Sequence, residues 1–227
     1  MNAAIIHQND AVIIQQAFDY QGSHAFSDMM RLTYQRHASY ALAHNFDYWH
    51  TIGPVRADLN GGGWCKIELI ARALAQGYKF VAWIDADAAI VSGEADLREA
   101  LPEGKYIGAC EHNADWFKLP QWQIPAHYNV GVTYWRNSQK TLYFVKEWLD
   151  AYPGDKRWME QGSFNDLIKD ERYAPYFHAC DAKYNATVNV NPVSKPVVMG
   201  WHGVQPIARR LLMMKATMKD DVLKFRV

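Results

Sequence analysis

Short apolar runs alternate with amphipathic segments along the first ninety residues. Residues 11–18 and 46–50 are apolar or aromatic runs between turn-forming residues, which predicts two strands. Residues 27–43 and 64–77 repeat apolar side chains three and four positions apart, which predicts two helices. Residues 79–90 begin as a further buried strand. A strand–helix–strand–helix–strand order is typical of a parallel sheet covered by helices.

The second half is less regular. Its pattern predicts strands over 106–110 and 128–135, helices over 138–149 and 160–168, an extended segment over 188–199, and a basic amphipathic helix in the tail 209–227. We therefore expect an α/β fold with a mixed, mostly parallel sheet flanked by helices, in a single domain over 1–227.

Two carboxylates, Asp85 and Asp87, end the predicted strand that begins near residue 80. If the backbone stays extended, both side chains point the same way and repel each other. A divalent cation such as Mg²⁺ or Mn²⁺ relieves that repulsion, whereas the alternative is a solvated loop or a helix cap. Ligands of parallel sheets bind at the carboxyl ends of strands, which favours the metal site.

Composition narrows the class of protein. The 227 residues carry 24 basic and 24 acidic side chains, and 49% of them are hydrophobic, which excludes a disordered or strongly polyanion-seeking chain. Aromatic residues make up 14%, and such rings fill cores or stack on sugars and bases. Three scattered cysteines form neither a disulfide framework nor a zinc motif. With no signal peptide and no transmembrane segment recognisable, we expect a cytoplasmic protein.

Four ordered segments resemble the GT-A glycosyltransferases, and within them glycosyltransferase family 34, which includes galactosyl-, mannosyl- and xylosyltransferases. They are Trp64-Cys65-Lys66 at a helix start, Trp83-Ile84-Asp85-Ala86-Asp87-Ala88, Asn129-Val130-Gly131 with Arg136-Asn137 and Trp148, and Glu160-Gln161. The resemblance implies a metal-dependent, retaining transfer of a sugar from a nucleotide diphosphate sugar, expected to be a UDP-sugar. It also implies a nucleotide-binding half over 1–105 and an acceptor half over 106–227.

The metal ligands follow from the resemblance. It assigns Asp87 and His202 as direct ligands, while Asp85 either binds the metal or orients the ribose. An imidazole among the ligands favours Mn²⁺ over Mg²⁺. His127 and His178 are the lesser alternatives to His202.

The resemblance also assigns catalytic and binding residues. Gln161 is expected beside the anomeric carbon, and Glu160 is expected to stabilise charge, position the acceptor or act as a nucleophile; the alternative is a pair that caps a helix. The donor-binding candidates are Gln16, Ala17, Phe18, Lys66, Asp85, Ala86, Asn129, Gly131 and Gly203. The acceptor-binding candidates are Asn113, Asp115, Trp116 and Trp122.

One departure from the family concerns the residues after His202. The family's phosphate-binding lysine is missing there, and Arg209 or Arg210 is the candidate replacement.

Several partners remain open at this level. The expected acceptor is a cell-surface glycan intermediate, and the alternative is a hydroxymethylated DNA base, as in phage-type enzymes. The basic tail suits a peripheral membrane or nucleic-acid contact, although a packed helix with a solvated face is the commoner explanation. A metal-dependent nucleotide-sugar hydrolase or a non-catalytic nucleotide-sugar binder are the competing functions.

Overall fold

A six-stranded sheet forms the centre of the computed structural model, which describes residues 8–20, 23–59, 61–112, 127–153, 158–188 and 193–218. Its strands are β1 (Ala11–Ala17), β2 (Asp47–Ile52), β3 (Phe80–Ile84), β5 (Ile107–His112), β6 (His127–Arg136) and β7 (Phe177–Cys180). They run in the order β2-β1-β3-β6-β5-β7, and β6 is antiparallel to both of its neighbours while the other neighbouring pairs are parallel. The expected mixed, mostly parallel sheet is confirmed.

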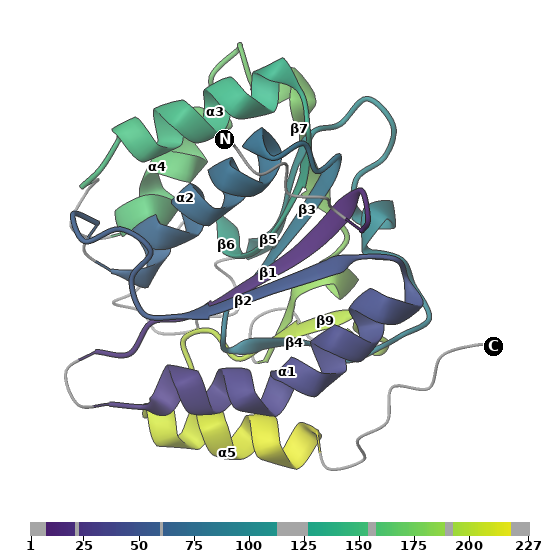
Figure 1. Ribbon diagram of the computed structural model, residues 1–227, viewed down its shortest axis with the longest axis vertical. Helices are drawn as coiled ribbons and strands as arrows, with labels where there is room; N and C mark the ends of the chain where they lie inside the picture. Colours follow the sequence, from purple (N-terminus) through teal and green to yellow (C-terminus); the bar gives the residue numbers. More distant parts are fainter. Residues whose placement is uncertain are drawn as a thin grey trace.

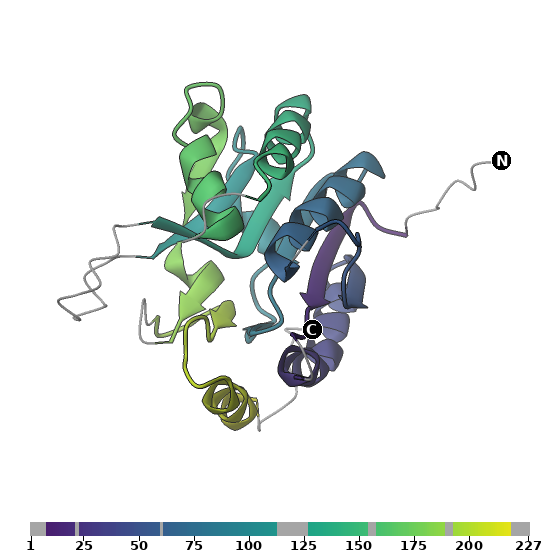
Figure 2. The ribbon, with the colours of Figure 1, turned by 90° about the vertical axis from the view of Figure 1, so that its left-hand side faces the viewer.

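Helices cover both faces of this sheet (Figure 1). One face carries α2 (Gly62–Ala75), α3 (Gln139–Asp150) and α4 (Met159–Leu167), and α1 (Ala25–Ala43) packs on the other. Beyond it, α5 (Ile207–Thr217) lies against α1, and the two helices are seen side by side at one end of the molecule in Figures 1 and 2. The described residues also form three 3₁₀ turns: η1 (Leu97–Ala100), η3 (Ala174–Tyr176) and η4 (Ala182–Asn185).

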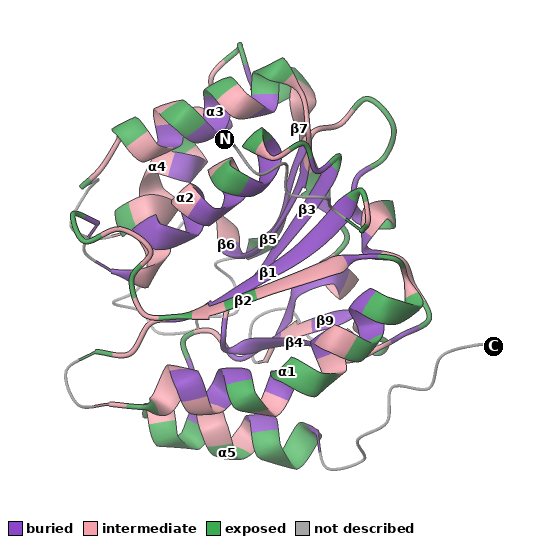
Figure 3. Ribbon diagram, in the orientation of Figure 1, coloured by how far each residue is buried: buried purple, intermediate pink, exposed green. Residues whose placement is uncertain are grey.

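Because both faces are covered, the central strands β1 and β3 are buried along their whole length and are mostly apolar. All seven residues of β1 are buried, with Val12 and Ile14 in the core under α2 and α3, and Ala11 and Ile13 in the core under α1. The buried colour runs along the central strands in Figure 3. In the sequence these strands are therefore recognised by continuous apolar runs, and not by an alternation of apolar and polar residues.

A second, three-stranded sheet extends the first beyond the aspartates. It contains β4 (Ala88–Ile90), β9 (Val198–Gly200) and β8 (Ala186–Thr187), in the order β4-β9-β8. The central strand β9 leads directly into Trp201 and His202, and so carries the distant histidine to the aspartates. No described helix is both long enough and apolar enough to cross a membrane.

Helix α1 begins two residues earlier than the apolar pattern predicts. Its first backbone N–H groups bond to the carboxylate of Asp19, at 2.9 Å from Phe26 N and 3.2 Å from Ser27 N. A side chain that lies six residues before the helix therefore satisfies the unpaired N–H groups of its first turn.

Candidate functional site

Asp85 and Asp87 lie on a tight turn between β3 and β4. The turn is closed by Ala88 N–H donating to the carbonyl of Asp85 at 3.0 Å. Asp85 N–H donates to Gly131 of β6 at 2.8 Å, and Trp201 N–H donates to the carbonyl of Asp87 at 2.9 Å. The backbone is therefore not extended across the pair, and its position is fixed from both sheets.

His202 joins the two aspartates. Asp85, Asp87 and His202 each offer one ligand atom, and these atoms lie within 4.8 Å of one another. The Nδ1 of His202 is 2.9 Å from Asp87 Oδ1, and its buried Nε2 has no hydrogen-bond partner among the described residues. Two carboxylates and an imidazole form a donor set that fits a divalent cation such as Mn²⁺. His127 and His178, the lesser alternatives, are not part of this group.

The imidazole fits because two glycines leave room for it. A Cβ at Gly131 would lie 2.4 Å from His202 Cε1, and one at Gly200 would lie 2.5 Å from Nε2. Burial opposes protonation of His202, but the carboxylates of Asp87 and Asp85 outweigh it and raise the pKa of the ring above its ordinary value.

Arg210 of α5 binds the second oxygen of Asp87. Its Nη1 lies 2.5 Å from Asp87 Oδ2, and its Nε donates to the carbonyl of Val204 at 3.2 Å. Both side chains are buried. Burial alone would raise the pKa of Asp87, but His202 and Arg210 lower it to about 2, so the carboxylate stays charged. Of the two replacement cations considered, Arg210 reaches the site and Arg209 is exposed.

Lys66 forms a second charged group with Asp85 and Glu160. Its Nζ lies 3.2 Å from Asp85 Oδ1 and 3.4 Å from Glu160 Oε1, and it donates to the carbonyl of Val130 at 3.0 Å. Burial opposes its charge, yet the two carboxylates raise the pKa of Lys66 above its ordinary value. Trp83 Nε1 also donates to Asp85 Oδ1, at 2.6 Å. The ammonium thus links the turn to the start of α4.

Gln161 and Asn129 form an amide cluster along β6. The Oε1 of Gln161 accepts from Val130 N at 3.2 Å and from Asn129 Nδ2 at 3.3 Å. The Oδ1 of Asn129 accepts from Gly131 N at 2.9 Å and from Asn185 Nδ2 at 2.9 Å. These amides fix the stretch of β6 that lies next to His202.

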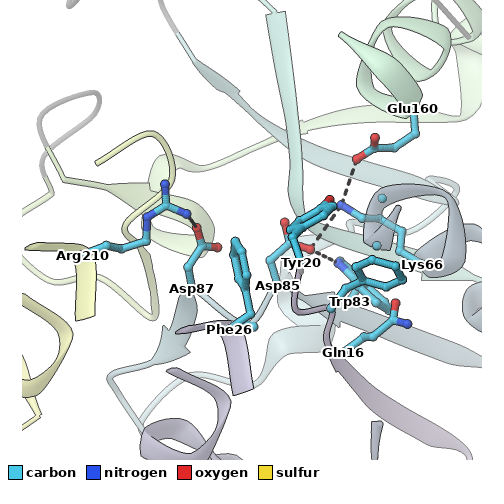
Figure 4. Close-up of a pocket in the computed structure, with 13 residues that line it drawn as sticks. Gln16, Tyr20, Phe26, Lys66, Trp83, Asp85, Asp87, Glu160 and Arg210 are labelled. Atoms are coloured by element: carbon cyan, nitrogen blue, oxygen red, sulfur yellow. Dashed lines mark hydrogen bonds and ion pairs between the residues drawn. The ribbon is translucent and has the colours of Figure 1, made fainter. Parts of the chain in front are cut away.

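A cavity of about 230 Å³ opens in front of these groups. Figure 4 shows Asp87 with Arg210 on one side of it, and Asp85, Lys66 and Glu160 on the other. Its lining includes seven of the residues expected from the sequence: Gln16, Phe18, Lys66, Asp85, Ala86, Asp87 and Glu160.

Other expected residues lie beside the cavity or away from it. Asn129, Gly131, Gln161 and His202 are not in its lining, although His202 lies 2.9 Å from the lining residue Asp87. Ala17 is buried in β1, where its carbonyl accepts from Gly53 N, and Gly203 is exposed with a φ of 73°. The acceptor candidates Asn113, Asp115, Trp116 and Trp122 lie outside the described residues, as does the tail from residue 219.

Arg210, one of the two candidate replacement cations, also lines the cavity, and five further lining residues were given no role from the sequence: Tyr20, Phe26, Gly62, Gly63 and Trp83. A glycine pair before the helix and a tryptophan two residues before Asp85 were visible signals. Gly63 is needed because a Cβ there would lie 2.2 Å from the carboxylate of Glu160. Nothing in the sequence pattern singled out Phe26.

Comparisons with known proteins bear on the family and the fold. The family model described as nucleotide-diphospho-sugar transferase matches residues 62–200. A glycosyltransferase involved in the glycosylation of the major capsid of PBCV-1 has a similar structure, with a TM-score of 0.65 and 13% identity over 91% of this chain and 99% of that one. No curated protein sequence matches this chain.

Two further solved structures share the fold. Mouse xyloside xylosyltransferase 1 in its apo form has a TM-score of 0.52 and 9% identity, over 86% of this chain and 99% of that one. The galactosyltransferase LgtC, in complex with donor and acceptor sugar analogs, has a TM-score of 0.52 and 12% identity, over 90% and 95%. At such identities the likeness concerns the fold.

Proposed function

This chain belongs to the nucleotide-diphospho-sugar transferase family, and on that premise we propose that it transfers a sugar from a UDP-sugar to a hydroxyl acceptor with retention of configuration. Family membership and the shared fold confirm the expectation of a glycosyltransferase with the GT-A fold. The single observation that supports the metal-dependent form of the reaction is the convergence of Asp85, Asp87 and His202 beside one cavity.

Charge neutralisation is the central task of such a site, because a nucleoside diphosphate departs as the sugar bond breaks. A Mn²⁺ ion, or Mg²⁺, held by Asp87 and His202 with Asp85 beside them, would act as a Lewis acid on the diphosphate oxygens. Arg210 lines the same cavity and adds a fixed positive charge. We assign it the phosphate-contacting role of the lysine that is missing after His202.

Glu160 is a third carboxylate that lines the cavity, besides Asp85 and Asp87. Its Oε1 lies 3.4 Å from the ammonium of Lys66, and the absence of a side chain at Gly63 lets it sit there. We propose that Glu160 contacts the transferred sugar and stabilises its developing positive charge. Gln161, expected at the anomeric carbon, bonds to Asn129 and Val130, and its place beside the reacting carbon stays a prediction.

Aromatic rings at the outer end of the cavity suit a nucleobase. The ring centroids of Phe18 and Tyr20 are 5.3 Å apart, and those of Tyr20 and Phe26 are 6.4 Å apart. Gln16 reaches the same cavity, with its Nε2 donating to the carbonyl of Gly53 at 2.7 Å. We propose that the base stacks on these rings, which leaves the diphosphate next to the Asp87–Arg210 pair.

The test measures UDP release and sugar transfer with a panel of UDP-sugars, with Mn²⁺, Mg²⁺ or EDTA, and with glycan or hydroxymethylated DNA acceptors. We expect transfer that EDTA abolishes and that Asp87→Asn lowers by at least about a hundredfold, with the product's anomeric configuration, read by NMR, unchanged from the donor. UDP release that is equal in EDTA and Mn²⁺ would contradict the metal role. Release without transfer to any acceptor would favour a hydrolase.

A further inference from the structure

A buried glutamine lies in a strand that is otherwise mostly apolar. Gln15 lies in β1 and is fully buried, among neighbours that are mostly alanine, valine and isoleucine. Burying an amide without hydrogen-bond partners is unfavourable, because the group loses its bonds to water. Its partners therefore show what the amide is there to hold.

The amide of Gln15 has partners from three different elements. Its Oε1 accepts from the hydroxyl of Tyr48 in β2 at 2.8 Å, and its Nε2 donates to the hydroxyl of Thr33 in α1 at 3.0 Å. The Nε2 also donates to the carbonyl of Asp85 at 3.3 Å. The third partner is the backbone of the turn that carries the two metal-binding carboxylates.

This contact supplies a side-chain bond to the turn from the α1 side. The same carbonyl accepts from Ala88 N at 3.0 Å, so Gln15 reinforces the bond that closes the turn. Asp85 N is held from the other side by Gly131 of β6. The Asp85 end of the turn is thus held between β1 and β6.

We infer that Gln15 is a positioning residue for the metal-binding turn, acting through the backbone carbonyl of Asp85. It touches neither donor nor acceptor and is not part of the cavity lining. Its effect is to hold Asp85 and Asp87 at the spacing that lets both face His202. The inference depends on the proposed metal site, and binding of Mn²⁺ by the unaltered protein tests that premise separately.

The test compares variants that remove different hydrogen bonds of the Gln15 amide. Gln15→Met keeps the length and removes every bond, whereas Thr33→Val with Tyr48→Phe removes the other two partners and keeps the bond to Asp85. Mn²⁺ affinity is measured without substrate by the EPR signal of free Mn²⁺, and unfolding is measured in EDTA. We expect Gln15→Met to weaken Mn²⁺ binding by about tenfold or more, as loss of outer-shell support does, and the double variant to keep affinity within about twofold.

Two results would overturn the inference. One is an Mn²⁺ affinity for Gln15→Met equal to that of the unaltered protein in a chain that still folds. The other is an equal loss of affinity in the double variant, because that would mean affinity follows general stability rather than the Asp85 contact. If the unaltered protein itself binds no Mn²⁺, the proposed metal site fails first, and that outcome is distinguishable from both.

Discussion

The lack of a side chain at Gly131 leaves the space that the His202 ring occupies. Replacing Gly131 with alanine would place a Cβ 2.4 Å from Cε1 and 2.7 Å from Nε2 of His202. We expect Gly131→Ala to push the imidazole away from the aspartates and to lower Mn²⁺ affinity by about tenfold or more. Calorimetric titration with Mn²⁺ measures this directly.

A second glycine provides the matched control. At Gly108 of the neighbouring strand β5, a Cβ would lie 2.6 Å from Leu101 and 2.7 Å from Cys180 Sγ, a comparable collision far from the metal-binding group. Gly108→Ala should destabilise the fold by about 1–3 kcal/mol and leave Mn²⁺ affinity unchanged. Equal losses of affinity in the two variants would refute the specific role of Gly131.

Lys66 compensates the negative charges of the two carboxylates beside it. It is 2% exposed and lies between Asp85 and Glu160. Lys66→Met leaves two carboxylates facing each other with no cation, so we expect a loss of about 3 kcal/mol in the free energy of unfolding and weaker donor binding. Urea denaturation and donor titration measure the two effects. Lys79→Met, at an exposed lysine, should change neither, and a matching loss there would contradict the assignment.

Individual residues of the site were predictable only where their type signalled chemistry. Asp85 and Asp87 stand out because carboxylates that end an apolar strand need a counter-charge. Gln15 carries no such signal, since nothing local shows that its amide reaches Thr33, Tyr48 and the carbonyl of Asp85. Its role depends on three elements meeting, and sequence spacing does not encode that meeting.

At the scale of elements, helix α5 is part of the site through one side chain. Arg210 binds Asp87, the same carboxylate that a metal ion would need. Arg210→Leu removes a competitor for that carboxylate, so we expect tighter Mn²⁺ binding in the absence of nucleotide. Without nucleotide or metal the fold should lose about 3 kcal/mol, because the buried Asp87 loses its guanidinium partner.

The same variant should bind a UDP-sugar more weakly, because the fixed positive charge beside the diphosphate is gone. Arg209→Leu is the control, since Arg209 is exposed on the same helix. Isothermal titration of Mn²⁺, and of UDP-sugar in saturating Mn²⁺, separates the two effects. If Arg210→Leu and Arg209→Leu behave alike in both titrations, α5 has no role in the site.

The sequence predicted most of the helices and strands, but it predicted the order and direction of the strands in the sheet less well. Continuous apolar runs located β1 and β3, and helical spacing located α1 and α2. Nothing in those patterns indicated that β6 enters the sheet antiparallel between β3 and β5, because strand direction depends on the path of the connecting chain. That insertion is what brings Gly131 to the turn that carries Asp85 and Asp87.

At the scale of the whole molecule, a buried histidine ties stability to pH. His37 in α1 is fully buried, and its Nε2 accepts the N–H of Ile90 at 3.1 Å. Burial, with a smaller contribution from Arg36, lowers the pKa of His37 from 6.5 to about 3. Between these values the unfolded chain binds a proton that the folded chain does not, so stability falls as pH falls, by at most about 1.4 kcal/mol per pH unit.

Urea denaturation at about pH 7 and about pH 5 tests this in the unaltered protein and in His37→Gln, where the loss between the two pH values should shrink by about 2 kcal/mol. The comparison of differences cancels any constant cost of the substitution. His50→Gln, at an exposed histidine of β2, should leave the loss unchanged. An undiminished loss in His37→Gln would show that His37 is not the group that titrates.

The connection from α5 to Asp87 has a consequence for how the protein matures during synthesis. The cavity draws on side chains from Gln16 near the start to Arg210 near the end of the described chain. A ribosome must therefore release nearly the whole polypeptide before the last cation reaches its carboxylate. Until then Asp87 lacks its guanidinium partner, so the site can be completed only after every strand of the central sheet has been synthesised.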